Sequence, residues 1–422
     1  MADSLSAEFR DTLSKSTAPG SNKVPGCILA AVDRNGESLC LETSGSLLTQ
    51  STHTSSPPMP INPNSTFWMA SCGKLIATLA ALQCVERGLI SLDDPNAIAR
   101  ILPELTQPLV FTDAKGSDLT TVPATTQITL RHLLSHTSGL AYDFFEEKLQ
   151  AWRVNRGEPP VLSLGGDVVR AHSVPLLFEP GTGFVYGGGI DWTGELIARL
   201  TNTSLESYLQ THIFQPLNMT STTFRLQDHG DIQERIYPMY ARGEDGTLSP
   251  SQNPWPAEPS ADCAGAGLYS SVPDFIKLLA DLIREEPRLL KKETIETYMF
   301  SPQFPSGSEP QLAMAQSIGM ISAMTGSDQD KDKSASGINL GLGGVFFTED
   351  SGHIKAGTLA WGGLPNVMWS ANRKVGVATL FATQLLPYND AECLALEKGF
   401  RGEVDRISEA RKQQRITGKS GM

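Results

Sequence analysis

A run of apolar residues between Ser71 and Gly88, with the sequence SCGKLIATLAALQCVERG, predicts a helix. Between Lys74 and Gln83 the run leaves almost no polar face, and a helix that is apolar on all sides is buried in a protein. The polar pair ahead of Gly88 and the glycine itself are typical of a helix C-terminus. The pattern therefore predicts a central, buried helix that begins at Ser71.

The two ends of the chain carry strand patterns instead. Residues 27–43 alternate in polarity around the turn Arg34-Asn35-Gly36, and Asn-Gly between such runs indicates a hairpin. A short amphipathic helix at about 3–16 precedes the hairpin, and a closing helix covers roughly 390–412. Ahead of that closing helix lie four short β-type runs, at residues 343–347, 354–361, 367–371 and 375–382. We expect one antiparallel sheet built from both ends of the chain and flanked by the terminal helices.

The middle of the chain, from about 89 to 330, has helices and long loops without clear strand alternation. The helical patterns lie at residues 129–134, 192–200, 207–212 and 274–283. The charged, serine-rich residues 325–337 predict a surface loop. The expected fold class is mixed α/β (α+β), a single catalytic domain over residues 1–422. Its sheet lobe covers approximately 1–65 and 338–422, and its mainly helical lobe approximately 66–337. The active site is expected in the cleft between the lobes.

Composition and charge narrow the range of partners. The 422 residues carry a formal charge of −12, which disfavours nucleic acid and anionic membranes. No stretch is long and apolar enough to span a bilayer, and the first residues do not resemble a secretory signal. Six scattered cysteines without C-x-x-C spacing are typical of reduced thiols in a cytosolic enzyme. We therefore expect a cytoplasmic protein.

Motifs for metals and cofactors are missing from the sequence. The seven histidines form no metal-ligand pattern, and there is no P-loop. The glycine run at 187–189 lacks the strand-helix-strand context of a dinucleotide site. We expect neither a metal nor a cofactor.

Ser71 is the only serine with a lysine three residues on, at Lys74. Residues at i and i+3 share a helix face, so the two side chains can touch. A partly desolvated lysine loses its proton readily and can then take the serine's proton, which makes a nucleophile. The helix N-terminus also favours negative charge on the attacking oxygen. Because S-x-x-K is a weak motif, the alternative is an ordinary helix start with a serine cap. Cys72 points about 100° away from Ser71, so we interpret it as a packing residue.

Five segments in order carry a resemblance to a known family. They are ALQCVERGL (81–89), ITLRHLLSHTSGL (128–140), VYGGGIDWTGELI (185–197), WGGLPNVMW (361–369) and QLLPYND (384–390). Together they resemble the serine β-lactamase and penicillin-binding-protein superfamily, specifically its class C-like esterases and transesterases. Within it, the chain is most similar to the fungal acyltransferases that attach the lovastatin side chain. The resemblance covers about residues 9–400.

The resemblance implies a catalytic centre and an oxyanion hole. Ser71 would be the nucleophile, Lys74 its partner, and Tyr186 a phenolate that shares the role of base and later protonates the leaving group. A cationic Lys74 would lower the pKa of Tyr186. The backbone N–H groups of Ser71 and Leu364 would form the oxyanion hole. Without the resemblance, Tyr186 would be interpreted as an aromatic packed under a glycine loop.

Two departures from the family pattern affect the substrate. Gly188 stands where β-lactamases have an asparagine, and Trp361-Gly362-Gly363 replaces Lys-Thr-Gly. Without the lysine that binds the carboxylate of β-lactams, we expect Trp361 to form an apolar wall, and the two glycines to let the strand backbone approach the substrate.

Further candidates lie outside these motifs. Tyr388 and Trp68 are aromatic candidates for the substrate cleft, and each could equally belong to the core. His136 is a rival base, although a histidine at a helix end is favoured electrostatically without any catalytic role. Residues 142–178 are expected to shape the acyl pocket or a lid.

The sequence thus predicts a serine acyltransferase that works through an acyl-enzyme. The likeness implies an acyl thioester donor, on a carrier protein or coenzyme A, and a hydrophobic polyketide-type alcohol as acceptor. A carboxylesterase is the nearest alternative. A non-catalytic protein that binds a hydrophobic ligand and a true β-lactamase or peptidase are further alternatives, and Trp361 and Gly188 disfavour the latter.

Overall fold

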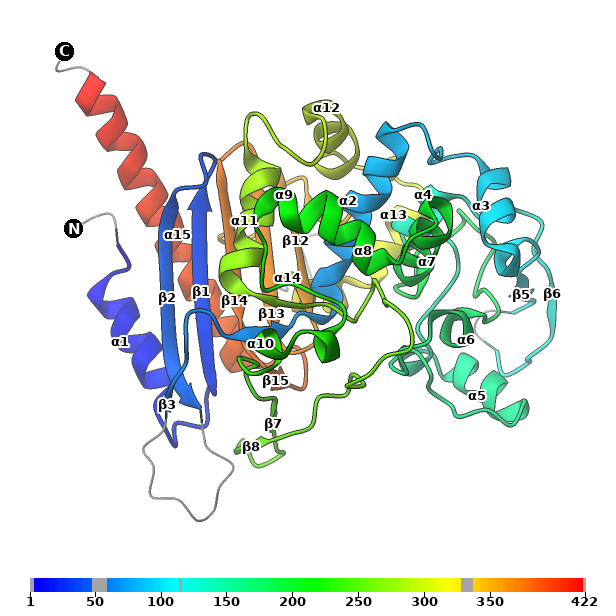
Figure 1. Cartoon of the computed structure of the whole chain (residues 1–422), viewed down its shortest axis with the longest axis horizontal. Helices are drawn as coiled ribbons and strands as arrows, with labels where there is room; N and C mark the ends of the chain where they lie inside the picture. Colours follow the sequence, from blue (N-terminus) through cyan, green and yellow to red (C-terminus); the bar gives the residue numbers. More distant parts are fainter. Residues whose placement is uncertain (1–3, 48–58, 114–115, 328–336, 420–422) are drawn as a thin grey trace.

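The computed structural model describes residues 4–47, 59–113, 116–327 and 337–419. Its main feature is an eight-stranded antiparallel sheet in the order β10-β11-β12-β13-β14-β1-β2-β3 (Figure 1). The strands are β1 (Gly26–Asp33), β2 (Ser38–Leu47), β3 (Met59–Pro60), β10 (Ile338–Gly341), β11 (Gly344–Phe347), β12 (Thr358–Gly363), β13 (Val367–Asn372) and β14 (Val377–Ala382). The expected sheet from both ends of the chain is confirmed, because β1 pairs with β14 on one side and with β2 on the other.

The sheet is covered on both faces, which explains the composition of β1. All eight residues of β1 are buried, and they are almost all apolar. Helix α11 (Val272–Ile283) packs against β1 and β14, and α15 (Ala391–Lys419) passes behind the strands in Figure 1, with α1 (Ala7–Ser16) packed on it beside β2. The β1–β2 turn has Gly36 at φ +79°, a left-handed conformation that glycine adopts without strain. The predicted hairpin and both terminal helices are therefore confirmed.

The buried helix predicted after Ser71 is α2 (Gly73–Glu86), and it packs on α7 (Gly189–Thr201). Every residue from Gly73 to Cys84 is buried. Gly88 has φ +68° directly after the last helical turn, as the predicted C-terminus requires. Ser71 itself precedes α2 and lies in a single 3-10 turn, Ala70–Cys72, that leads into the helix.

Shorter elements complete the helical side of the molecule. The helices are α3 (Pro95–Ile101), α4 (Leu130–Leu134), α5 (Glu147–Asn155), α6 (Val168–His172), α8 (Leu205–Leu209), α9 (Gln215–Leu217), α10 (Gly230–Gln233), α12 (Lys292–Thr294), α13 (Glu309–Gln316) and α14 (Ile318–Thr325). Short strands pair as β4 (Thr66–Trp68) with β9 (Tyr269–Ser271), β5 (Leu109–Phe111) with β6 (Thr121–Pro123), and β7 (Tyr240–Arg242) with β8 (Leu248–Pro250) and β15 (Leu385–Leu386). Strands of two or three residues are too short to leave an alternating pattern in the sequence.

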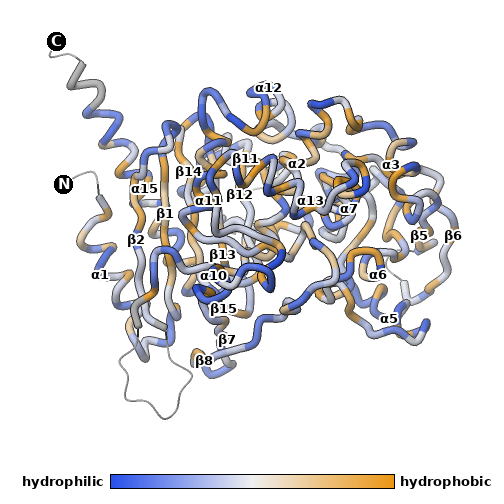
Figure 2. Tube along the Cα trace, viewed as in Figure 1, coloured by the Kyte–Doolittle hydropathy of each residue, from blue (hydrophilic) through white to orange (hydrophobic). Residues whose placement is uncertain are grey.

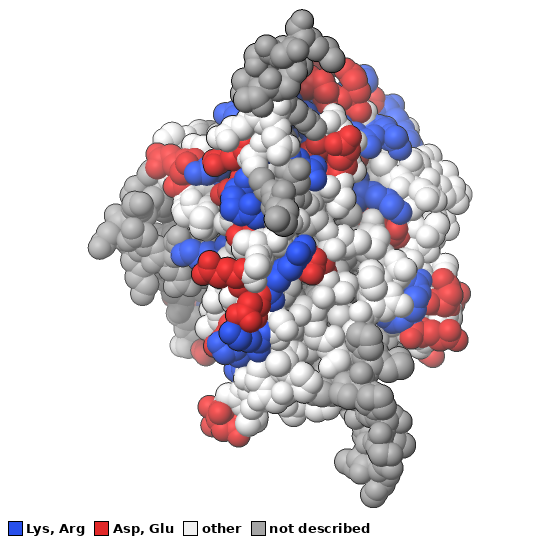
Figure 3. All heavy atoms as spheres, turned by 90° about the vertical axis from the view of Figure 1, so that its left-hand side faces the viewer, with Lys and Arg blue, Asp and Glu red and all other residues white. Residues whose placement is uncertain are grey.

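Hydropathy and charge follow this arrangement. Figure 2 shows hydrophobic residues along the inner strands and hydrophilic residues along peripheral loops. On the face seen in Figure 3, basic and acidic side chains are interspersed, so the net negative charge does not gather there as one patch. None of the described helices is long and apolar enough to cross a membrane. Most of the surface loop expected at 325–337 lies outside the described residues, and the division into lobes at 65 and 337 stays a prediction.

Candidate active site

Ser71 is presented by a strained turn at the start of α2. The preceding residue, Ala70, has φ +45°, which costs a residue with a side chain roughly 1–2 kcal/mol. Such strain persists only where the surrounding structure imposes it, and it is concentrated at functional sites. The turn lies between β4 and α2, and it places the Ser71 hydroxyl beside two other polar side chains.

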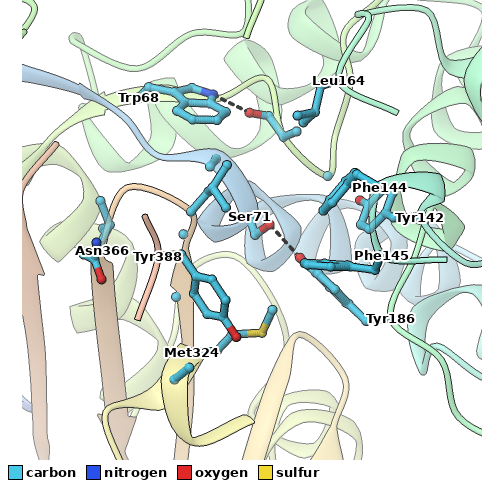
Figure 4. Close-up of a pocket in the computed structure, with 18 of the residues that line it drawn as sticks. Trp68, Ser71, Tyr142, Phe144, Phe145, Leu164, Tyr186, Met324, Asn366 and Tyr388 are labelled. Carbon is cyan, nitrogen blue, oxygen red and sulfur yellow. Dashed lines mark hydrogen bonds between the residues drawn. The ribbon is translucent and has the colours of Figure 1, made fainter. Parts of the chain in front are cut away.

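The structure brings together Ser71, Lys74 and Tyr186, although Tyr186 is 115 residues away in the chain. The Tyr186 hydroxyl donates to Ser71 Oγ at 2.6 Å (Figure 4). Lys74 Nζ donates to the same oxygen at 3.1 Å and to the Gly265 carbonyl at 2.6 Å. Ser71 Oγ is thus contacted by two groups that can carry its proton.

Burial sets the protonation of both partners. Lys74 is 3% exposed, and burial lowers its pKa to about 8, while Asp191 opposes the shift. The expectation of a lowered pKa for Tyr186 is wrong, because burial raises it and the hydrogen bond to Ser71 offsets this only in part. The Lys74 ammonium lies 4.8 Å from the centre of the Tyr186 ring, against its face. Tyr186 is therefore a neutral phenol at neutral pH. Of the two groups, only Lys74 changes its protonation close to neutral pH.

A mostly apolar cavity of about 650 Å³ opens onto Ser71. Of the residues singled out in the sequence, Gly362, Gly363, Leu364, Tyr388 and Trp68 line it. The stretch expected to shape the acyl pocket contributes Tyr142, Phe144, Phe145, Ser163 and Leu164. Figure 4 shows the aromatic rings of that stretch on one side of Ser71 and Tyr388 with Met324 on the other. None of the described lining residues is charged, so the cavity suits an uncharged, hydrophobic group.

Several lining residues were not found from the sequence. Met324 comes from α14, and Met368 from β13, and neither carries a motif. Asn366 has φ +59°, and its side-chain amide donates to the carbonyls of Leu385 and Pro387. A turn-favouring asparagine is a recognisable signal, but its role in holding the loop before Tyr388 depends on tertiary contacts.

Comparison with known proteins identifies the family to which this chain belongs. A family model described as Beta-lactamase matches residues 16–398. The chain belongs to the β-lactamase family. The acyltransferase calJ of Penicillium decumbens is 37% identical over 81% of this chain and 81% of its own. Monacolin J acid methylbutanoyltransferase of Aspergillus terreus is 31% identical, over 91% and 92% of the two chains. Lovastatin esterase of Penicillium rubens is also 31% identical, over 93% and 97%.

A solved structure supports the same assignment. Simvastatin synthase from Aspergillus terreus, in its LovD6 mutant form, matches this chain with a TM-score of 0.83 and 29% identity. The match covers 95% of each chain. The predicted family and fold class are confirmed.

The first departure from the β-lactamase family motifs has a packing explanation. A Cβ at Gly188, where β-lactamases are expected to carry asparagine, would lie 2.4 Å from Nδ1 of His172. The buried His172 ring therefore fills the space beside this position. Glycine at 188 follows from the neighbouring histidine.

The second departure requires a correction. Trp361 was expected to wall the substrate cavity, but its indole is 2% exposed and lines a separate small cavity behind Lys74. It stacks on the His136 ring at 6.1 Å and lies 5.5 Å from the Tyr186 ring. The reason is strand alternation: residues 361 and 363 point to the same side of β12, where the Ser71 turn presses on the strand. A Cβ at Gly363 would lie 2.4 Å from the Met69 carbonyl oxygen.

Close packing on both sides of β12 also explains its two glycines. A Cβ at Gly362 would lie 2.4 Å from the carbonyl oxygen of Met324, on the side away from Gly363. Neighbouring backbone thus excludes a side chain at both positions. The sequence had instead suggested that these glycines let a substrate approach the strand. Both glycines still line the cavity beside Ser71.

His136 supports the site as a neutral group. Its ring lies edge-on to Tyr186 at 5.1 Å, and burial beside Lys74 lowers its pKa to about 3. Cys72 is fully buried, and burial raises its pKa, so it is a thiol rather than a reactive thiolate. All six cysteines are unpaired. Within the described ranges, no three His, Cys, Asp or Glu residues are grouped to hold a metal.

Proposed function

We propose that this β-lactamase-family chain is an acyltransferase that moves an acyl group from a thioester to the hydroxyl of a polyketide-type acceptor through an acyl-enzyme on Ser71. The observation that carries the proposal is the pair of contacts on Ser71 Oγ, from Tyr186 at 2.6 Å and Lys74 at 3.1 Å, at the wall of an apolar cavity. The names of the acyltransferase and methylbutanoyltransferase relatives support it.

Acylation begins with Lys74 in its neutral form. Lys74 takes the hydroxyl proton of Ser71 while Oγ attacks the thioester carbon, and the carbonyl electrons move onto the oxygen. The backbone N–H groups of Ser71 and Leu364 would hold this oxyanion. When the C–S bond breaks, the sulfur leaves with a proton, and the Tyr186 hydroxyl is the donor nearest to Ser71 Oγ. The proton on Lys74 then restores that of Tyr186.

Acyl transfer to the acceptor reverses these steps. The acceptor hydroxyl loses its proton to Lys74 as its oxygen attacks the acyl carbon, and Lys74 returns that proton to Ser71 Oγ as the C–O bond to the serine breaks. The apolar lining supports transfer over hydrolysis, because it favours a hydrophobic alcohol over water. We propose a carrier protein or coenzyme A as the thioester's carrier. The six unpaired cysteines support a reducing, cytoplasmic setting.

A carboxylesterase is the second candidate function, and the lovastatin esterase relative favours it. It would share the acyl-enzyme and differ only in the final acceptor. The loss of the carboxylate-binding lysine and the uncharged cavity disfavour a β-lactamase, which nitrocefin turnover would reveal. A non-catalytic binding protein would not need Ser71, Lys74 and Tyr186 in contact.

Intact-protein mass after mixing with short acyl thioesters tests the proposal. Wild type should gain one acyl mass, and Ser71→Ala should gain none. Chasing the adduct with water or with hydrophobic alcohols then separates the esterase from the acyltransferase. If rapid quenching detects no adduct with any thioester or ester, the acyl-enzyme mechanism is wrong and the binding-protein alternative gains.

A further inference from the structure

A buried carboxylate, Asp191, interacts with Lys74 and is linked to it through the backbone of Gly265. Asp191, in the first turn of α7, is 1% exposed. One of its oxygens accepts from the Tyr142 hydroxyl at 2.7 Å, and the other from the Gly265 N–H at 2.9 Å. The carbonyl of the same Gly265 accepts from Lys74 Nζ at 2.6 Å. A single residue of backbone therefore connects the carboxylate to the lysine.

Gly265 in this bridge has no space for a side chain. A Cβ at Gly265 would lie 2.3 Å from an oxygen of Asp191 and 2.6 Å from the Tyr142 hydroxyl oxygen. Gly265 also lines the substrate cavity, as does the Tyr142 ring. The position of the Gly265 carbonyl, and with it that of Lys74, depends on the carboxylate that holds the loop from behind.

The other titratable groups near Lys74 are neutral at neutral pH. Burial raises the pKa values of the nearby phenols and thiols and lowers those of the imidazoles. These neutral groups are Cys72, His136, Tyr142, His172, Tyr186 and Cys263. Beyond His172, Arg153 pairs with Asp143 and with Glu158. The carboxylate of Asp191 is therefore the anion that faces Lys74 across Gly265.

We propose that Asp191 is a positioning residue of this site: by bridging Tyr142 and Gly265, it fixes the carbonyl that receives Lys74 and supplies the buried negative charge that balances the lysine's cation. The inference rests on the proposed role of Lys74 as the base for Ser71. Asp191 does not touch Ser71, so its effect on the nucleophile passes through Lys74. Tyr142 contacts both the substrate cavity and the Asp191 carboxylate. Its ring lines the cavity, and its hydroxyl donates a hydrogen bond to the carboxylate.

Two substitutions change the electrostatic stabilisation of the Lys74 cation in opposite directions. Asp191→Asn removes the negative charge, so the ammonium form of Lys74 loses stabilisation and the lysine becomes neutral at a lower pH. Tyr142→Phe keeps the carboxylate but removes a hydrogen bond that disperses its charge, so Lys74 becomes neutral at a higher pH. A residue that only maintained the fold would lower the rate without moving the titration midpoint.

The experiment is the pH dependence of the acylation rate, measured by stopped flow with a short-chain p-nitrophenyl ester. We expect a midpoint near pH 8 for wild type, set by Lys74. Asp191→Asn should lower this midpoint by about one pH unit, and Tyr142→Phe should raise it. At pH well below both midpoints, Asp191→Asn should then retain about a tenfold larger fraction of its own plateau rate than wild type.

The matched control is Glu195→Gln, which removes an acid from the same helix. Glu195 pairs with Arg199 at 2.7 Å and does not line the cavity, so its midpoint should equal that of wild type. Circular dichroism and the thermal midpoint establish that each variant is folded. If Asp191→Asn does not fold, the proposal is tested by Tyr142→Phe alone, whose acylation midpoint should lie at a higher pH than that of wild type.

The outcomes separate this inference from the proposed function. Labelling of Ser71 in wild type by a fluorophosphonate, read by mass, establishes the nucleophile independently of pH. If Ser71 is labelled but the midpoints of the folded variants match that of wild type, Asp191 has no positioning role. If both variants shift in the same direction, the charge argument is wrong. If Ser71 is not labelled, the proposed function fails first.

Discussion

The wall of the cavity opposite Tyr388 depends on one buried ion pair. Asp143 and Arg153 are both 1% exposed, and Arg153 Nε donates to Asp143 at 2.8 Å. Asp143 also accepts from the backbone N–H groups of Leu162 at 2.8 Å and Ser163 at 3.2 Å. The pair therefore ties the residues next to Phe144 to the far end of the same stretch.

Replacing Arg153 with methionine leaves the Asp143 carboxylate buried without its cation. Removal of one partner of a buried pair costs about 3–5 kcal/mol, because the remaining charge is uncompensated. We expect Arg153→Met to lose stability in this range, and its thermal midpoint to fall on the order of 3–6 °C for a chain of 422 residues. The cavity wall carried by this stretch should loosen, so the KM for the acyl donor should rise more than the plateau acylation rate falls.

Thermal denaturation followed by circular dichroism, with steady-state kinetics, measures both effects. The control is Arg156→Met, since Arg156 lies just after α5, is 55% exposed at its side chain and pairs with Glu158 at 3.3 Å. A surface pair of this kind contributes about 0–1 kcal/mol. Adding Asp143→Asn to Arg153→Met removes the stranded charge and should recover part of the loss.

Similar thermal midpoints for Arg153→Met and Arg156→Met would refute this account. The buried pair would then not hold the cavity wall. A rise in KM without any loss of stability would instead mean that Arg153 acts on the substrate by another route.

Three further predictions concern the reacting groups. The acylation rate should rise with pH through about 8, because burial lowers the pKa of Lys74 and only its neutral form accepts the Ser71 proton; a rate independent of pH from 6 to 10 would contradict this. Tyr186→Phe should slow acylation by about 10²–10⁴-fold in rapid-quench mass measurements, because the hydroxyl 2.6 Å from Oγ is lost, and an unchanged rate would exclude its role. Gly188→Asn should cost about 1–3 kcal/mol through its clash with His172, and adding His172→Ala should recover stability; if the single variant melts with wild type, the packing explanation for Gly188 is wrong.

Local features could be predicted because the residues that cause them are adjacent in the chain. The buried α2 follows from its unbroken apolar pattern, and the β1–β2 hairpin from Asn-Gly between alternating residues. The contact between Ser71 and Lys74 follows from the i, i+3 spacing at the start of α2. Tyr186, more than a hundred residues away, was reached only through the resemblance to a family.

Six of the eight sheet strands, the buried helix and the serine with a lysine beside it were predictable from the sequence, whereas β3 and β10 were not. Only the folded structure shows that Tyr186 is a neutral phenol, because burial depends on how many distant segments surround a group. It also decided that Trp361 faces His136 rather than the cavity, because the side of a strand on which a residue lies is set by pairing register. The Asp191–Gly265–Lys74 bridge joins three separate segments, and only their packing against one another brings them together.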